Sequence, residues 1–248
     1  MKHLLIVISL LFISCSALGA EESDAHWSYQ GMDGPEYWAE LSAKYALCRD
    51  GKNQSPVDLV ADYHVGLPEL VFQYHGTPIH ETNNGHTIML KVSEGNYLDV
   101  PEKKWRFQLL QGHFHSPSEH TINGESFAME IHLVHANEDG QIAVVGVMVE
   151  EGEENAMLNR IWSFMPDNVG DSTESPLTVF EAGVLPPTRN YFTYDGSLTT
   201  PPCTEGIQWF VLRDPLTASA EQIERFKGRV GPSTNRPTQP HNARMILD

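Results

Sequence analysis

The sequence predicts a mainly β (α+β) fold, and three observations support this prediction. Two stretches, 105–115 and 126–137, alternate polar and apolar residues with the period of a β-strand. The run 142–149 is continuously apolar, as in a strand buried on both faces. Helical spacing of apolar residues is found at 153–165 and at 219–230. Strand signals therefore outnumber helical ones, and 248 residues can form one β-rich domain with a substantial core.

The first 19 residues resemble a secretory signal peptide. Lys2 supplies a positive end, residues 4–13 form an apolar run too short to span a bilayer, and small residues lead to Gly19. We expect cleavage after Gly19, a mature catalytic domain at 20–248, and a periplasmic or secreted location. A weaker alternative is lipid anchoring at Cys15.

The charge of the chain limits its partners, and its cysteine content indicates a disulfide. The formal net charge is −17, and loss of Lys2 with the signal would make it −18. Such an acidic surface disfavours nucleic acid and anionic membranes as partners. Removal of the signal leaves Cys48 and Cys203, which in an exported chain favour one disulfide; two free thiols are the alternative.

The first strands are expected at 70–74 and 86–92, and Asn83-Asn84-Gly85 forms a turn before the second of them. His86 therefore lies at the start of a strand beside a turn, where its ring stays solvated. An unperturbed imidazole titrates near neutral pH and can carry protons.

Alternation in 105–115 and 126–137 brings polar residues together. If the two strands are neighbours, three imidazoles converge on one spot. Apolar residues of both strands point the opposite way. The convergent faces hold Gln111, His113 and His115 on one strand and Glu130, His132 and Val134 on the other; the opposite faces hold Leu110, Gly112 and Phe114, and Met129, Ile131 and Leu133.

Three neutral imidazoles with a free fourth position form a catalytic zinc site. Water in the free position becomes a nucleophile near neutral pH. Gln111 and Glu130 lie one step behind the histidines and can accept the second ring N–H, which fixes the tautomer. A His-x-His pair can also merely line a wet sheet face, but the third histidine and the two acceptors favour the metal interpretation.

The C-terminal half predicts further elements in order. Two prolines after Thr199 and Thr200 favour an extended loop that does not pair in a sheet. The other expected elements are a helix at 153–165, a polar surface connection at 167–187, a strand at 191–194 leading to a turn at Gly196, a strand at 206–213, and a helix at 219–230 with Ser219 as its N-cap.

Five segments together resemble the alpha-class carbonic anhydrases of exported bacterial type. Q-x-H-F-H-x(3)-E-H begins at Gln111 and E-x-H-L-V-H begins at Glu130. Asn-Asn-Gly-His ends at His86, G-S-L-T-T-P-P-C ends at Cys203, and N-R-P-T-Q-P ends at Pro240. The resemblance covers nearly the whole chain after residue 25. It implies a large, mostly antiparallel, twisted central β-sheet with short peripheral helices.

The resemblance also implies a function: zinc-dependent, reversible hydration of carbon dioxide to bicarbonate and a proton. Zn²⁺ held by His113, His115 and His132 carries the hydroxide that attacks the substrate, and His86 passes the proton to buffer. Glu119 and Thr199 orient that hydroxide. Anions and sulfonamide-type molecules are the expected inhibitors. Similar bacterial enzymes are often dimers, so a homodimer is one alternative and the oligomeric state stays open.

Other residues receive roles from the same resemblance. Val134 belongs to the substrate pocket by alternation alone. The main-chain carbonyl near Thr234 is the expected partner of the remaining imidazole, and Met89 departs from a commoner polar residue in the cavity. The resemblance adds Val144, Leu198, Thr200, Ile207 and Trp209 to the pocket, places Tyr29 and Asn84 in the cavity and proton path, and pairs Cys48 with Cys203. His120 and His135 are expected to be hydrogen-bonded structural residues, and His64, His75 and His80 surface residues.

Two alternatives compete with this prediction. In a cupin-type metalloenzyme, Glu119 would join His113 and His115 in binding iron or manganese, but a second cupin motif is missing. In a non-catalytic binding protein of the same fold, a ligand histidine has typically been lost, whereas this chain has three in phase.

Overall fold

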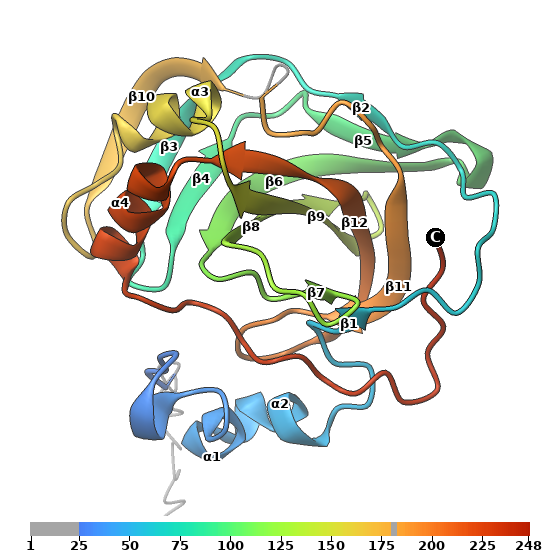
Figure 1. Cartoon of the computed structure of the whole chain (residues 1–248). Coiled ribbons are helices and arrows are strands. Elements are labelled where there is room, and N and C mark those ends of the chain that lie inside the picture. The colour runs from blue at the N-terminus through green and yellow to red at the C-terminus, as the bar shows by residue number, and fades with distance from the viewer. Residues whose placement is uncertain (1–24, 180–182) are drawn as a thin grey trace, which may run out of the picture.

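The computed structural model describes residues 25–179 and 183–248, and it is built around one large twisted sheet (Figure 1). The predicted signal peptide and Cys15 lie outside the described residues. The strand order is β10-β3-β4-β6-β8-β9-β12-β11, and β5 pairs with both β6 and β2. Neighbouring strands are antiparallel except that β9 and β12 run parallel. The predicted mostly antiparallel sheet is confirmed, with the correction that it is mixed.

The strands of the sheet are β2 (Val71–Gln73), β3 (Thr77–Asn83), β4 (Ile88–Val92), β5 (Tyr97–Val100), β6 (Trp105–His115), β8 (Met129–Ala136), β9 (Ile142–Glu151), β10 (Ser172–Val179), β11 (Tyr191–Ser197) and β12 (Glu205–Ala218). A small separate sheet joins β1 (Asp58–Leu59) to β7 (Thr121–Ile122).

Short helices lie at the periphery of the sheet (Figure 1). No helix in the described part of the chain is long and apolar enough to cross a membrane. The α-helices are α1 (Trp38–Leu41), α2 (Leu47–Asp50), α3 (Ala156–Trp162) and α4 (Ala220–Val230), and the 3₁₀ turns are η1 (Gly31–Asp33), η2 (Ala43–Tyr45) and η3 (Pro101–Lys103).

The main core lies between one face of the sheet and helices α3 and α4. Met129, Ile131 and Leu133 of β8 are almost fully buried in it, as alternation predicts. Aromatic rings join the layers: Phe114 of β6 lies 4.9 Å, centroid to centroid, from Trp162 of α3, which stacks on Phe226 of α4. A second apolar cluster covers the opposite face of β9 and β12, so β9 is buried on both faces as predicted.

Leu110 differs from the prediction, because it does not share the buried face with Gly112 and Phe114. It is 40% exposed, and the register of β6 against β8 shifts between Leu109 and Gln111. An extra residue in one strand of a pair is a β-bulge, which changes the faces of the residues that follow. Leu109 and Phe114 are separated by an odd number of residues, which would put them on opposite faces of a regular strand. The bulge lets both side chains reach the core.

The region predicted as a surface connection at 167–187 contains a strand instead. Residues 172–179 form β10, which pairs with β3 at the edge of the sheet. Its register shifts between Ser175 and Thr178, and Pro176 lies in that irregularity. Edge strands tolerate polar residues and proline, so alternation does not reveal them.

Gly196 does not form the expected turn. It lies within β11, where the register shifts between Gly196 and Ser197. A Cβ on Gly196 would lie 2.8 Å from Trp209 Cδ1, which is closer than real Cβ contacts. The glycine therefore permits a close approach of Trp209 inside a bulged strand.

Helix α3 is shorter than predicted, and α4 agrees with the prediction. Asn155 caps α3 by accepting from the N–H groups of Met157 and Leu158, which leaves Glu153 and Glu154 outside the helix. Ser219 caps α4 in a capping box with Gln222.

The disulfide between Cys48 and Cys203 is present, as predicted. It ties α2 of the N-terminal segment to the loop between β11 and β12, across a sequence separation of 155. That loop carries Thr199 and Thr200, so the bond lies next to the site described below.

Candidate active site

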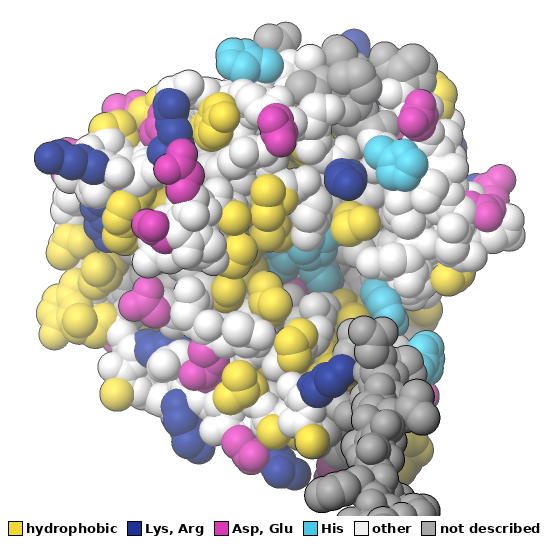
Figure 2. Space-filling model, turned by 180° about the vertical axis from the view of Figure 1, so that it is seen from behind, with side chains coloured by type: hydrophobic (Ala, Val, Ile, Leu, Met, Phe, Trp, Pro, Cys, Tyr) yellow, Lys and Arg dark blue, Asp and Glu magenta, His cyan; other side chains and the backbone are white. Residues whose placement is uncertain are grey.

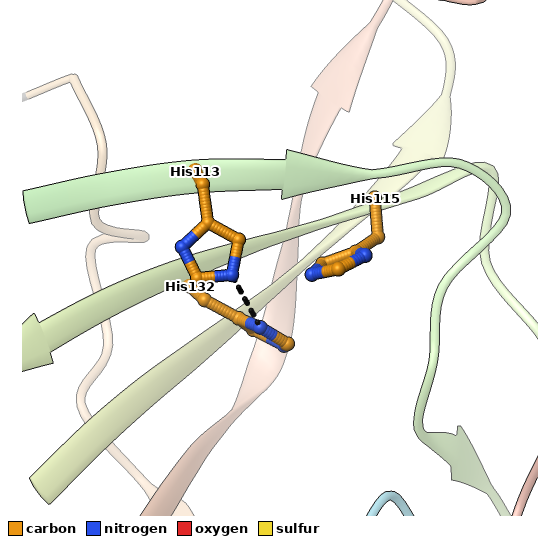
Figure 3. A group of neighbouring side chains, drawn as sticks. All are labelled: His113, His115 and His132. Carbon is orange, nitrogen blue, oxygen red and sulfur yellow. Dashed lines mark hydrogen bonds between the residues drawn. The ribbon is translucent and has the colours of Figure 1, made fainter. Parts of the chain in front are cut away.

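Three histidine rings from two paired strands converge at one point (Figure 3). His113 of β6 lies directly opposite His132 of β8, and His115 follows two residues along β6. The ring centroids are 5.0 Å apart for His113 and His115, 5.1 Å for His113 and His132, and 4.7 Å for His115 and His132. One nitrogen of each ring lies within 4.8 Å of the others. The predicted pairing of these two strands is thus confirmed.

Each ring donates its other N–H to an acceptor outside the cluster. His113 Nδ1 lies 2.9 Å from Gln111 Oε1, and His132 Nε2 lies 2.9 Å from Glu130 Oε1. His115 Nδ1 lies 2.5 Å from the main-chain carbonyl of Thr234. Because a carbonyl or carboxylate oxygen only accepts, the ring nitrogen carries the proton in each pair. These tautomers leave unprotonated His113 Nε2, His115 Nε2 and His132 Nδ1 facing inward.

The inward nitrogens fit a metal ion. His132 Nδ1 lies 3.3 Å from His113 Nε2, so two lone pairs face each other. This spacing is about the separation of two nitrogens bound to one tetrahedral zinc ion. His115 Nε2 is buried without a hydrogen-bond partner among the described residues. A cation between the rings resolves both features, since each lone pair then has a partner.

Electrostatics keep the three rings neutral. Burial lowers the pKa of His115 to about 4 and lowers the pKa of His132. Burial, with the charges of His115 and His132, lowers the pKa of His113 well below its ordinary value. Neutral imidazole is the form that binds a metal, so the site does not need to lose protons at neutral pH.

Glu130 is held ionised by a buried network. Its Oε2 accepts the N–H groups of Glu119 and His120, both at 2.9 Å. Its Oε1 accepts from His120 Nδ1 at 2.8 Å as well as from His132. Burial raises the pKa of Glu130, but the two histidines outweigh that effect and hold it well below the ordinary value. His120 extends the network to Tyr194 at 2.6 Å, which is the structural, hydrogen-bonded role expected for it.

Glu119 lies beside the three rings without being one of the clustered ligands. Its Oε1 accepts the N–H of Arg236 at 2.8 Å. Its Oε2 lies 3.5 Å from His115 Nε2 and has no hydrogen-bond partner among the described residues. Burial raises the pKa of Glu119 to about 7, against the lowering effects of His132, the Arg236 N–H and a hydrogen bond from the Thr199 hydroxyl. Glu119 and Thr199 are thus brought together, both almost fully buried.

A hollow leads from the surface to the histidine cluster. Figure 2 shows histidine side chains at its floor and hydrophobic side chains around it. The inner cavity has a volume of about 130 Å³. Its lining includes His113 and His115 of β6, the predicted cavity residues Tyr29 and Asn84, the predicted proton carrier His86, and Thr200, which was predicted in the substrate pocket. Met89, opposite His113 in the register of β4 and β6, also lines it.

The remaining pocket residues form an apolar wall. Val144, Ile207 and Trp209 are buried in the second apolar cluster, and Val134 and Leu198 pack against it. The Trp209 ring lies 4.9 Å from the ring of His132, so this wall borders the ligand cluster. The wall thus borders His132, whereas the inner cavity borders His113 and His115, so both lie against the histidine cluster.

Two residues near the site have no role in the sequence analysis. Arg236 is 1% exposed; its guanidinium donates to Gln54 and to the carbonyls of Ser55 and Cys48 while its N–H holds Glu119. Trp27 stacks on His86 at 3.7 Å between ring centroids. The Asn-Arg-Pro run containing Arg236 could have drawn attention, because a buried arginine needs a polar cage. No sequence pattern indicates the Trp27 stack.

The comparisons define the class of the protein. The family model described as eukaryotic-type carbonic anhydrase matches residues 33–248. The chain therefore belongs to the eukaryotic-type, or alpha, carbonic anhydrase family. The protein is a carbonic anhydrase. The cupin interpretation is therefore wrong, since family, fold and the position of Glu119 outside the ligand cluster all disagree with it.

Bacterial relatives are similar over almost the whole chain. A carbonic anhydrase of Pectobacterium atrosepticum is 40% identical over 240 residues, covering 97% of each chain. One of Neisseria gonorrhoeae is 41% identical over 245 residues, covering 97% of this chain and 95% of its own. The solved alpha-carbonic anhydrase of Thermovibrio ammonificans, in complex with the inhibitor sulfanilamide, is 41% identical with a TM-score of 0.87, covering 91% of this chain and all of that one.

Proposed function

We propose that this carbonic anhydrase hydrates carbon dioxide reversibly at a zinc ion held by His113, His115 and His132. The observation that carries the proposal is the set of three inward-facing, unprotonated nitrogens with outward protons fixed by Gln111, Glu130 and the Thr234 carbonyl. When bound, zinc with three neutral ligands lowers the pKa of its water and supplies a nucleophile near neutral pH.

Glu119 and Thr199 orient the reacting oxygen in this proposal. In this role an ionised Glu119 would accept the hydroxyl proton of Thr199, which is buried beside it, and the threonine oxygen would then be left as an acceptor. A zinc ion held by the three histidines would supply the reacting oxygen, and Thr199, acting only as an acceptor, would fix the direction of its O–H and so orient it toward the substrate. Arg236 and the network of Glu130 hold this arrangement in place.

Carbon dioxide is apolar, so the apolar wall of Val134, Val144, Leu198, Ile207 and Trp209 is its proposed binding surface. The one side-chain donor in this wall, the indole N–H of Trp209, is used by the Ser197 carbonyl at 3.0 Å, so the wall offers apolar contact that does not favour bicarbonate. Thr200, which lines the inner cavity, can contact the polar product.

His86 is the proposed proton carrier. It lines the inner cavity, and burial together with the charge of His26 lowers its pKa. A carrier must both accept and release a proton near neutral pH, and imidazole is suited to this. Asn84 shapes the turn, because its Oδ1 accepts the N–H groups of His86 and Thr87 at 2.9 Å. Tyr29, whose pKa burial and the charge of Glu119 raise well above its ordinary value, stays protonated in the cavity.

We also propose export to the periplasm or outside the cell, and inhibition by anions and sulfonamides. The inhibitor proposal rests on the sulfanilamide complex of the similar Thermovibrio ammonificans enzyme. Light scattering would test whether the protein is a homodimer.

The test of the function replaces His113 by Ala and measures bound zinc by elemental analysis together with carbon dioxide hydration. We expect loss of stoichiometric zinc and a fall in kcat/KM of at least about 10³-fold, because the reaction depends on the metal. Exposed His75 changed to Gln is the matched control and keeps both. Zinc-loaded wild type without hydration activity would instead support the non-catalytic binding protein.

The proton-carrier assignment is tested with His86→Ala at low buffer concentration. We expect a kcat lowered by about 10-fold or more with kcat/KM retained, since proton transfer follows the chemistry. Added imidazole should restore the rate. A variant that stays slow in imidazole, or one as fast as wild type, would remove His86 from this role.

A further inference from the structure

A second cavity lies beside the first residues of β11, away from the histidine cluster. Its volume is about 550 Å³, which is within the range of small-molecule binding sites. Among the described residues, none lines both this cavity and the inner cavity at the ligand histidines. The lining consists of residues 64–70 together with residues 189–191, Arg213 and Asp248.

Hydrogen bonds hold the walls of this second cavity in place. The Tyr191 hydroxyl donates to the carbonyl of Pro68 at 2.7 Å, which ties the segment 64–70 to β11. The N–H of Val65 donates to the carbonyl of Asp248 at 2.7 Å, which fixes the start of the same segment. Leu70, at its end, is 3% exposed and belongs to the main core. The cavity is therefore preformed, and a ligand needs to order little of the protein when it binds.

The cavity gathers positive charge in an acidic protein. The formal net charge of the chain is −17, yet His64, Arg189 and Arg213 all line this cavity. Two of these cations share one acid: Asp248 accepts from Arg213 at 2.7 Å and also contacts His64. The side chain of Asp248 is only 3% exposed, so these three groups largely satisfy one another. Arg189 is left as the cation that can meet a ligand.

Arg189 has no carboxylate partner among the described residues. Its guanidinium carries five N–H donors, but within the described part of the chain it makes one hydrogen bond, to the carbonyl of Thr188 at 3.2 Å. The guanidinium carbon lies 5.7 Å from the ring centroid of Phe72, so the group is held against an apolar surface. Burial lowers the pKa of Arg189, and Tyr74 only partly opposes this effect. An anion in the cavity would supply the counter-charge and the acceptors that this guanidinium lacks.

We propose that the second cavity binds a small organic carboxylate with an apolar body. The carboxylate accepts two N–H bonds from the planar fork of Arg189, and the body lies against the apolar side chains of Leu67 and Leu70. One negative charge is favoured over two, because Arg213 is already paired and Glu69 adds a negative charge to the lining. Sulfate and phosphate dianions are therefore poor ligands. The inference goes beyond the proposed function and does not depend on it, since the two cavities have separate linings.

The test titrates the zinc-loaded protein with benzoate by isothermal titration calorimetry. Excess sulfanilamide, the inhibitor bound by the similar Thermovibrio ammonificans enzyme, is present to occupy the active site. We expect saturable binding of benzoate and an affinity lowered by about 10- to 100-fold in Arg189→Gln, because a hydrogen bond to a charged group is lost. Arg189→Lys keeps the charge without the fork and should lie between the two. Arg160→Gln, which removes an exposed arginine of α3, is the matched control and should bind like wild type.

A second pair of variants changes the charge of the cavity and leaves Arg189 in place. Gly66 lines the cavity, and a Cβ at this position would meet no atom within 4 Å, so a side chain fits there. Gly66→Glu should weaken benzoate binding and Gly66→Lys should strengthen it, because the ligand is an anion. None of these variants should change carbon dioxide hydration.

Three results would overturn the proposal. The first is benzoate binding that is absent, or that is equally tight in wild type and R189Q. The second is binding of benzamide, the uncharged analogue, as tightly as benzoate, which would mean that Arg189 does not recognise the charge. The third is binding of sulfate as tightly as benzoate, which would mean that the apolar wall takes no part.

Discussion

Glu81 of β3 is a buried carboxyl group outside the active site. It is fully buried, and neither oxygen has a hydrogen-bond partner among the described residues. Burial raises the pKa of Glu81 to about 8. In the unfolded chain this carboxyl group loses its proton above a pH of about 4.3, but in the folded chain it does so only near its raised pKa. The contribution of Glu81 to stability is therefore full below pH of about 4 and is lost as pH rises toward 8.

Glu81→Gln should remove this pH dependence. At pH 8 the variant should be more stable than wild type by on the order of 3 kcal/mol, and at pH 5 the difference should be much smaller. Urea denaturation at the two pH values measures both. Glu174→Gln, an exposed residue of the neighbouring strand β10, is the control. Equal losses of stability in E81Q and wild type between pH 5 and 8 would contradict the prediction.

At the scale of single residues, alternation is enough to bring His113, His115 and His132 together, because the period of two and the pairing of adjacent strands are local rules. It also places Gln111 and Glu130 beside two of the rings. Arg236 and Trp27 could not be predicted in this way. Their contacts join residues far apart in the sequence, and the geometry that makes them important exists only in the folded chain.

Among the elements, α4 depends on its capping box. Ser219 accepts the N–H of Gln222 at 3.3 Å, and Gln222 Oε1 accepts the N–H of Ser219 at 3.1 Å. Gln222 also donates to the carbonyl of Asn155, so the box joins α4 to the start of α3. Loss of the cap therefore weakens the cover of the main core.

Ser219→Ala should lower the free energy of unfolding by about 1 kcal/mol, because an orphan N–H at the helix start loses its acceptor. Ser219→Asp retains an acceptor and should stay close to wild type. Equilibrium urea denaturation compares the three proteins. A Ser219→Asp protein as unstable as Ser219→Ala would show that the cap is not the cause.

Elements with strong periodicity were predictable, and edge elements were not. β6, β8, β9 and α4 have regular patterns because one or both faces are buried. β10 lies at the edge of the sheet, where one side of the strand has no neighbouring strand, so its sequence can be polar. The bulge at Leu110 and the bulged strand at Gly196 depend on packing between strands, which alternation cannot express.

For the whole molecule, the disulfide between Cys48 and Cys203 closes a long loop. In the chain-entropy model, a disulfide that closes a loop of this length raises the free energy of unfolding by about 3 to 5 kcal/mol. The double variant Cys48→Ala/Cys203→Ala should be destabilised by that order in guanidinium denaturation. Each single variant should lose about as much as the double, because either one breaks the bond.

Reduction provides the control for this prediction. A thiol reductant should destabilise wild type and leave the double variant unchanged. Because Cys203 closely follows Thr200, we also expect the double variant to lose carbonic anhydrase activity at a lower temperature than wild type. Full stability of the double variant would show that packing around Trp38 and Tyr45, rather than the covalent bond, holds the N-terminal segment.

The parallel pair of β9 and β12 has a consequence for synthesis of the chain. β9 is an apolar strand of the central sheet. One of its edges pairs with β8, but the partner of its other edge, β12, is not synthesised until residues 205–218. A nascent or prematurely terminated chain thus carries an open, apolar strand edge that other chains can join. Products that stop before residue 205 should aggregate, and folding should be completed only after β12 has emerged from the ribosome.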